Sequence, residues 1–151
     1  MSNPKYPIEG GCMCGQVRML ISAPPIITMA CHCAGCQKLS ASAFSLSAMI
    51  PSAGFAVVKG EPAIGALHGA SKYLYCPNCL NWLFTRPAGM DAFVNVRPTM
   101  FDVPAWSTPF IETCTSEKLS WASTAAKQSF DRFPAPDQYG KLIADYSAQA
   151  T

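Results

Sequence analysis

Apolar and polar residues alternate along short stretches of this chain, with the two-residue period of a β-strand that has one buried face. Residues 44–48 show the pattern most clearly, as Phe-Ser-Leu-Ser-Ala. Turns rich in proline and glycine, such as residues 51–54, separate these stretches. Many short strands joined by such turns predict a mostly β, antiparallel fold. The predicted strands cover residues 16–21, 26–30, 44–50, 55–59, 72–76, 82–85, 92–96 and 111–115.

Helical character is limited to three short stretches, predicted at residues 34–39, 123–130 and 138–146. No linker, low-complexity tract or repeat interrupts the chain, so residues 1–151 are expected to form a single domain with few short helices. Residues 39–58 carry no charge, but several serines, Pro51 and Gly54 interrupt them. A membrane-spanning helix is therefore not expected.

Charged residues make up 13% of the chain, and the formal net charge is +2. No run of lysine or arginine is present, so neither nucleic acid nor a membrane surface is an expected partner. The first residues lack the apolar stretch of a signal peptide, which favours a cytoplasmic location. Eight cysteines in 151 residues are too few for a small disulfide scaffold. In a reducing compartment, clustered cysteines are typical of metal or redox sites.

All the cysteines but Cys114 occur in three tight groups. Zinc binds thiolates in a tetrahedron at about 2.3 Å, so the sulfurs of one site must lie close together. A C-x-x-C turn brings two sulfurs together readily, and a C-x-C pair does so in a bend. Gly10, Gly11 and Gly15 are expected to permit that bend by adopting positive φ. The groups are Cys12 with Cys14, Cys31 with Cys33 and Cys36, and Cys76 with Cys79.

Counting these ligands predicts two Zn²⁺ ions per chain. The two outer pairs together make a closed four-thiolate site, which is the structural pattern, whereas the central triple leaves a fourth position open, which is the catalytic pattern. An open position suits water or a soft ligand such as a substrate thiol. On spacing alone, the Cys12 pair can instead join the triple. A structural site completed by His32 or Cys114, or a redox switch, is a further alternative for the triple.

His32 lies between two proposed ligands, so its side chain is expected to point away from a metal that both neighbours bind. A hydrogen bond behind the site, or a proton-transfer role, fits its chemistry. Cys114 is expected to be a core thiol on a strand. His68 is expected to be a solvated residue in a loop rich in glycine and alanine.

Residues 10–18 read GGCMCGQVR, residues 31–44 read CHCAGCQKLSASAF, and residues 73–79 read YLYCPNC. These segments resemble the glutathione-dependent formaldehyde-activating enzyme (Gfa)-like family, which includes centromere protein V. The resemblance spans roughly residues 8–130. Two positions that are usually glycine in the family are Ala41 and Leu80 here, so the turn geometry near both motifs is expected to differ.

The resemblance implies a tent-like, zinc-stabilised antiparallel β fold. It also implies carbon–sulfur lyase activity, the formation or cleavage of S-hydroxymethylglutathione from formaldehyde and glutathione. The expected partner is therefore a small-molecule thiol or aldehyde. The implied ligands are Cys12, Cys14, Cys76 and Cys79 for a structural zinc, and Cys31, Cys33 and Cys36 for a catalytic zinc.

In the expected mechanism, the three-cysteine zinc holds and activates the substrate thiol as a thiolate, which meets formaldehyde. Gln37, Lys38 and Ser40 directly follow the central motif and are candidates for binding anionic or carbonyl groups of the substrate. Lys38 is equally well explained as a solvated surface lysine. Phe44 is expected to be a core residue rather than a wall of the substrate site.

A non-enzymatic zinc-binding module for protein interaction is the competing function. Trp82, Trp106 and Trp121 are candidate anchors for such an interface, although tryptophan is more often part of the core. A thiol-redox protein that uses Cys76 and Cys79 is a third possibility, but the glycine-flanked cysteines upstream favour metal binding. The apolar-rich composition is compatible with a homodimer.

Overall fold

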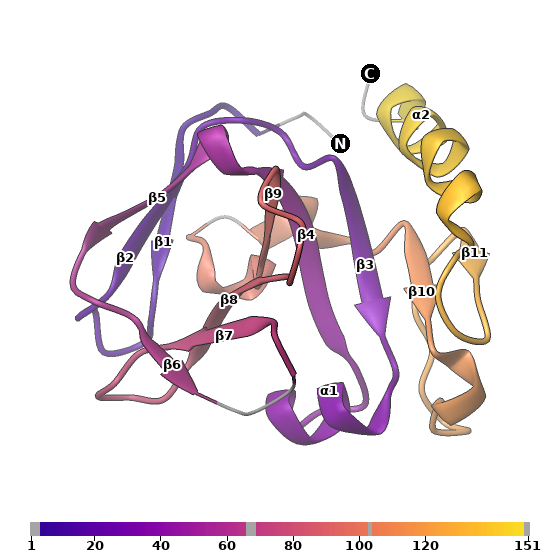
Figure 1. Ribbon diagram of the computed structural model, residues 1–151, viewed down its shortest axis with the longest axis horizontal. Coiled ribbons are helices and arrows are strands. Elements are labelled where there is room, and N and C mark those ends of the chain that lie inside the picture. The colour runs from indigo at the N-terminus through magenta and orange to yellow at the C-terminus, as the bar shows by residue number, and fades with distance from the viewer. Residues whose placement is uncertain (1–3, 66–68, 103, 150–151) are drawn as a thin grey trace.

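The computed structural model describes residues 4–65, 69–102 and 104–149 of the chain. Within these ranges the protein is mostly β, with two α-helices (Figure 1). A three-stranded antiparallel sheet has the strand order β1-β2-β5. Its members are β1 (Ile8–Gly11), β2 (Arg18–Ile21) and β5 (Phe55–Lys59).

A second sheet has the order β11-β10-β3-β4-β9-β8-β7-β6 among the described residues. Its pairs are antiparallel, except that β10 runs parallel to both β3 and β11. The sheet is therefore mixed at one end, whereas the sequence predicted antiparallel pairing. Its strands are β3 (Ile27–Cys31), β4 (Ser45–Pro51), β6 (Ala63–Gly65), β7 (Lys72–Tyr75), β8 (Trp82–Arg86), β9 (Phe93–Val96), β10 (Ile111–Thr113) and β11 (Gln128–Ser129).

The larger core lies between the two sheets. Strands β1, β2 and β5 contribute one side of it, and β4, β8 and β9 contribute the other. Two cysteines, Cys12 and Cys76, belong to this core. A smaller core forms where helix α2 (Tyr139–Gln149) packs its Leu142 and Tyr146 against Ile27 and Ile111 of the larger sheet. In Figure 1 this helix lies at the opposite side of the molecule from the three-stranded sheet.

The predicted strands are confirmed, with ends that shift by one or two residues, and so are the helices α1 (Ala34–Ser40) and α2. The predicted helix at residues 123–130 is wrong. Residues 123–127 have no regular secondary structure, and Gln128–Ser129 form β11, which pairs with β10 at the edge of the sheet. Strands β1 and β6 were not predicted. Each is short and has little apolar alternation of its own, so pairing with a neighbouring strand stabilises it.

The three tryptophans have different surroundings. Trp82 is buried, Trp106 packs partly buried against the larger core, and Trp121 is 75% exposed. His68 lies outside the described residues. Neither helix of the described ranges has the length and apolar character needed to cross a lipid bilayer.

Candidate metal centres

Seven cysteines gather at two places in the fold. Within each group, the Sγ atoms all lie within 4.8 Å of one another. None of the cysteines forms a disulfide. The two groups can each hold a metal ion. The four-cysteine cluster consists of Cys12, Cys14, Cys76 and Cys79, and the three-cysteine cluster consists of Cys31, Cys33 and Cys36.

Two hairpin turns form the four-cysteine cluster. One turn joins β1 to β2 and is closed by a hydrogen bond from Cys12 N to Val17 O of 3.1 Å. The other joins β7 to β8 and is closed in the same way by Cys76 N and Asn81 O at 3.0 Å. The Asn81 side chain links the turns, because its Oδ1 accepts from Met13 N at 2.8 Å. The cluster therefore connects the three-stranded sheet to the larger sheet.

The sulfurs of this cluster are closely spaced and unequally buried. The Sγ atoms of Cys12 and Cys14 are 3.4 Å apart, and those of Cys14 and Cys76 are 3.6 Å apart. Cys12 and Cys76 are buried, Cys79 is half-buried and Cys14 is exposed. Hydrogen bonds, first from the Asn78 side chain, lower the pKa of Cys14 to about 6. These hydrogen bonds therefore favour the thiolate form of Cys14, the form that binds a metal ion.

The glycines beside the first pair do not all act as the sequence predicted. Only Gly15 has a positive φ, 76°. Gly10 and Gly11 lie in β1, where each lets the backbone pass close to a neighbour. A Cβ on Gly10 would lie 2.4 Å from Met100 O, and one on Gly11 would lie 2.3 Å from Val17 O. Two of the three glycines thus serve close packing and not the bend.

The three-cysteine cluster comes from one corner of the larger sheet. Cys31 ends β3, Cys33 is the N-cap of α1, and Cys36 lies in the first turn of that helix. The Cys33 sulfur caps the helix by accepting a hydrogen bond from Cys36 N at 3.3 Å. All three cysteines are half-buried. A sequence of six residues therefore supplies all the sulfurs of this cluster.

The three thiols differ in how easily they ionise. The pKa of Cys31 is lowered to about 5, because the Cys36 thiol, the Cys33 backbone N–H and the Thr113 hydroxyl donate to its sulfur, although burial opposes this. The pKa of Cys36 is raised, since its thiol is the donor to Cys31 and is also buried. Cys31 is therefore the thiol of this cluster that ionises most readily.

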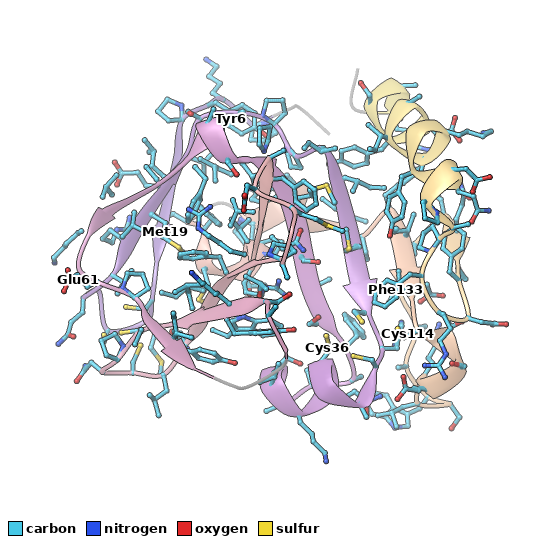
Figure 2. The ribbon with its side chains drawn as sticks, in the orientation of Figure 1. Tyr6, Met19, Cys36, Glu61, Cys114 and Phe133 are labelled. Atoms are coloured by element: carbon cyan, nitrogen blue, oxygen red, sulfur yellow. The ribbon has the colours of Figure 1, made fainter. Side chains whose placement is uncertain are left out.

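Cys114 lies close to this corner but outside the cluster. It is 2% exposed, as expected for a core thiol, but it follows β10 instead of belonging to it and has a left-handed backbone with φ of 55°. Burial and the neighbouring Cys31 raise its pKa to about 12. Figure 2 shows Cys36 and Cys114 near the end of β3.

His32 points away from the cysteine sulfurs and into the protein, in agreement with the sequence. The side chain is fully buried, and its Nε2 lies 2.9 Å from Glu112 Oε2. Its backbone N–H donates to Thr113 O at 3.0 Å, which ties the C-x-C segment to β10. No partner of His32 Nδ1 is present among the described residues.

Glu112 is a residue of the site that the sequence did not predict. Its carboxylate is buried and accepts hydrogen bonds from Ser129 Oγ at 2.7 Å, Thr124 Oγ1 at 2.9 Å and Lys118 Nζ at 3.1 Å, besides its contact with His32. Burial alone would raise the pKa of Glu112, but these hydrogen bonds lower it to about 2. The ionised carboxylate thus holds His32, and through it the backbone of the three-cysteine cluster.

The candidate substrate-binding residues have three different placements. Gln37 is used within the protein, since its Nε2 donates to His32 O at 2.7 Å and to Glu117 O at 3.0 Å. Lys38 is exposed and does not line the adjacent cleft. Ser40 does line this cleft.

The cleft has a volume of about 320 Å³, and its lining includes residues that follow each cluster along the chain. Phe44 is one of its walls and packs edge-on to His32 with ring centres 5.3 Å apart, whereas the sequence placed it in the core. Ser45 connects the cleft to the three-cysteine cluster, because its side chain hydrogen-bonds Cys36. The lining residues are Leu39, Ser40, Ser42, Phe44, Ser45, Leu46, Leu80, Asn81, Trp82, Arg97, Thr99 and Met100.

Ala41 and Leu80, which stand where the resemblance implies glycine, both have the left-handed backbone that glycine favours. Ala41, which caps the C-terminus of α1, has φ of 49°, and Leu80, which follows Cys79, has φ of 62°. Both therefore adopt the left-handed conformation without a glycine.

Comparisons with known proteins agree with these observations. A family model described as glutathione-dependent formaldehyde-activating enzyme matches residues 7–117, which is more than half of the chain and includes all seven clustered cysteines. Among curated proteins, none matches the chain significantly. The crystal structure of a Rhodobacter sphaeroides protein is similar, with 16% sequence identity, a TM-score of 0.54, and coverage of 63% of this chain and 88% of that chain. At this identity, the likeness shows the fold alone.

Proposed function

Because the chain belongs to the glutathione-dependent formaldehyde-activating enzyme family, we propose that it is a zinc-dependent carbon–sulfur lyase. Its substrate would be the adduct of a thiol with an aldehyde, such as S-hydroxymethylglutathione. The four-cysteine cluster would hold a structural zinc. The three-cysteine cluster would hold a catalytic zinc, and Cys31, Cys33 and Cys36 would be its ligands.

The observation that carries the proposal is the contrast between the two clusters beside one cleft. Four thiols complete a tetrahedron, and three leave a position for a ligand from solution. Wall residues of the cleft hydrogen-bond a cysteine of each cluster, Ser45 with Cys36 and Asn81 with Cys79. The number of thiols therefore distinguishes the two clusters, and the three-cysteine cluster is the one that would leave a position for a thiol from the cleft.

The donor sets fit zinc. Four sulfurs at about 2.3 Å from one ion lie about 3.8 Å from each other. The observed separations of 3.4 and 3.6 Å in the four-cysteine cluster are close to that spacing. An all-cysteine donor set is also characteristic of structural zinc and of soft metal ions generally.

The proposed reaction joins a thiol to an aldehyde without oxidation or reduction. A lone pair on sulfur attacks the carbonyl carbon, the C–S bond forms, and the thiol proton ends on the former carbonyl oxygen as a hydroxyl. The lyase direction reverses each step. When bound, zinc would supply a position for the substrate thiol and favour its thiolate form.

The chain's own residues prepare the site for this reaction. Hydrogen bonds from Cys36, Cys33 and Thr113 lower the pKa of Cys31 and so favour the thiolate form that a metal ligand needs. Glu112 and His32 fix the backbone that carries Cys31 and Cys33. Phe44 and Trp82 supply apolar parts of the cleft wall. Gln37 supports the loop that holds the ligands and would not contact the substrate.

The experiment uses two-dimensional exchange NMR on glutathione and formaldehyde, with the zinc-loaded protein present. The wild type is expected to accelerate exchange between free glutathione and its adduct, and Cys33→Ser is expected to abolish the acceleration. Equal exchange with wild type, with Cys33→Ser and without protein would reject the lyase. That outcome would favour the protein-binding module, for which the exposed Trp121 is the supporting observation.

A further inference from the structure

Arg97 is a buried cation in the wall of the cleft. It directly follows β9, and only 8% of its surface is exposed. Its guanidinium carbon lies 3.9 Å from the centre of the Trp82 ring. Such stacking fixes the plane of the guanidinium and leaves its edges free to form hydrogen bonds.

Arg97 has few partners for its charge. Within the described part of the chain no carboxylate forms an ion pair with it, its Nε has no hydrogen-bond partner, and its Nη2 has a long contact of 3.4 Å to Asn95 O. The exposed Arg18, in contrast, pairs with Asp102 at 2.9 Å and with Glu9 at 3.4 Å. Buried charges in proteins are normally paired, so the state of Arg97 requires an explanation.

The position of Arg97 suggests where the missing anion comes from. Among the residues that line the cleft, Arg97 is the one with a charged side chain, and the others are apolar or neutral polar. Burial lowers the pKa of Arg97 to about 10, so the group is still a cation at neutral pH. A ligand in the cleft would thus meet a single, fixed positive charge.

The thiols of the three-cysteine cluster offer a second explanation. Cys36 and Cys31 interact electrostatically with Arg97 and oppose the effect of burial on its pKa. In that case, Arg97 would serve only as a counter-charge for the cluster. A counter-charge does not need free hydrogen-bonding edges, however, whereas a planar, bidentate carboxylate contact does.

We propose that Arg97 binds a carboxylate of the thiol substrate in the cleft and thereby selects anionic thiols. This rests on the proposed function, since the substrate's sulfur is placed at the three-cysteine cluster. The substrate class is then a thiol that also carries a carboxylate, because Arg97 follows β9 whereas the cluster lies at the end of β3 and the start of α1. Thiols without a carboxylate would bind weakly.

The test is isothermal titration calorimetry of the zinc-loaded protein with S-methylglutathione and with its diethyl ester. S-methylglutathione has both carboxylates but no free thiol, so its binding does not depend on a sulfur–metal bond. The wild type is expected to bind the acid about 10- to 100-fold more tightly than the ester, as a charge-assisted hydrogen-bonded pair does. Arg97→Gln is expected to remove this preference.

Two further variants keep the test decisive. Arg132→Gln removes the same charge from an exposed position and should leave both affinities unchanged. Arg97→Lys keeps a buried cation but loses the bidentate edge, and is expected to lose most of the preference for the acid. If Arg97→Gln does not fold, the affinities of Arg97→Lys for the acid and the ester test the proposal instead.

Three results would overturn the proposal. The first is equal affinity of the wild type for the acid and the ester, and the second is an equal loss of affinity for the acid and the ester in Arg97→Gln. The third is unchanged affinity for both ligands in Arg97→Gln together with a lower zinc content, which would identify Arg97 as a counter-charge. A retained preference for the acid without catalysed exchange would instead reject the lyase and leave Arg97 as a carboxylate-binding residue.

Discussion

The two cysteine clusters differ in how much of the chain they join. The four-cysteine cluster draws on two hairpin turns from different sheets, and its Cys12 and Cys76 are part of the core between those sheets. The three-cysteine cluster lies within one short segment at the end of β3. An ion at the four-cysteine cluster would cross-link the two sheets, whereas an ion at the three-cysteine cluster would bind a segment whose conformation the protein already sets.

The hydrogen bonds that hold each cluster in place also differ. Behind the three-cysteine cluster, the buried Glu112 binds side chains from several segments and holds the loop in place through His32. Between the turns of the four-cysteine cluster, Asn81 Oδ1 accepts a hydrogen bond of 2.8 Å from Met13 N, and the Asn78 side chain and the Cys14 backbone hydrogen-bond sulfurs of the opposite turn. Contacts away from the sulfurs therefore hold the three-cysteine cluster, whereas an ion would add to contacts that the sulfurs of the four-cysteine cluster already make.

The largest expected effect separates the clusters by stability. Cys76→Ser should leave the chain unfolded at 25 °C, because a structural zinc contributes about 10–16 kcal/mol of binding free energy, as much as the whole stability of a typical domain. Cys33→Ser should lose one zinc and keep the fold, since serine can still cap α1. Circular dichroism and metal analysis measure both. Similar behaviour of the two variants would refute the division into structural and catalytic sites.

Removing the contacts that support the three-cysteine cluster should have an intermediate effect on stability. Glu112→Gln is expected to lower the free energy of unfolding by about 3 kcal/mol, the value of lowering a carboxyl pKa from its ordinary range to about 2. Because the folded-state pKa is depressed, this stabilisation is complete above about pH 4.5 and is lost as the pH falls towards 2. Urea unfolding at pH 7 therefore measures it in full.

Glu61→Gln is the matched control for that measurement. Glu61 is an exposed carboxylate on the far side of the molecule from Cys114 (Figure 2). Its replacement should change the free energy of unfolding by less than about 0.5 kcal/mol. If both variants lose the same amount, Glu112 does not support the cluster in the way described.

The smallest expected effect on stability should be the same beside both cysteine clusters. Ala41→Gly beside α1 and Leu80→Gly after Cys79 relieve a left-handed backbone, and each should stabilise the protein by about 0.5–1 kcal/mol. The melting temperature should rise by about 2 °C in each case. Gly15→Ala, at φ of 76°, should lower it. A lower melting temperature for either glycine variant would show that the side chain of Ala41 or Leu80 stabilises the protein by more than the left-handed backbone destabilises it.

The sequence predicted what is local and missed what is distant. Cysteine spacing identified the three groups, because a C-x-C or C-x-x-C segment brings sulfurs together within a few residues, whereas the joining of the Cys12 pair to the Cys76 pair rested on counting ligands and on the family resemblance. Glu112 was missed although the strand at 111–115 was predicted, since its partner His32 is 80 residues away along the chain. Arg97 was missed for the same reason: its burial and its stacking on Trp82 depend on the whole larger sheet.

The helix wrongly predicted at residues 123–130 illustrates the same limit. In that segment Thr124 and Ser129 donate to Glu112, and Gln128 pairs with Ile111 of β10. A buried carboxylate that needs hydrogen-bond donors thus determines the path of the chain there. No local pattern of apolar residues carries that information.

The central claim is that the three-cysteine cluster has a position for an external thiol and the four-cysteine cluster does not. It is tested most directly by loading the protein with Co²⁺ and titrating with glutathione, while recording the thiolate-to-cobalt absorption. The wild type should gain absorption equivalent to one further thiolate per chain. Cys33→Ser, which keeps only the four-cysteine site, should show no change. No gain in the wild type, or an equal gain in Cys33→Ser, would contradict the account.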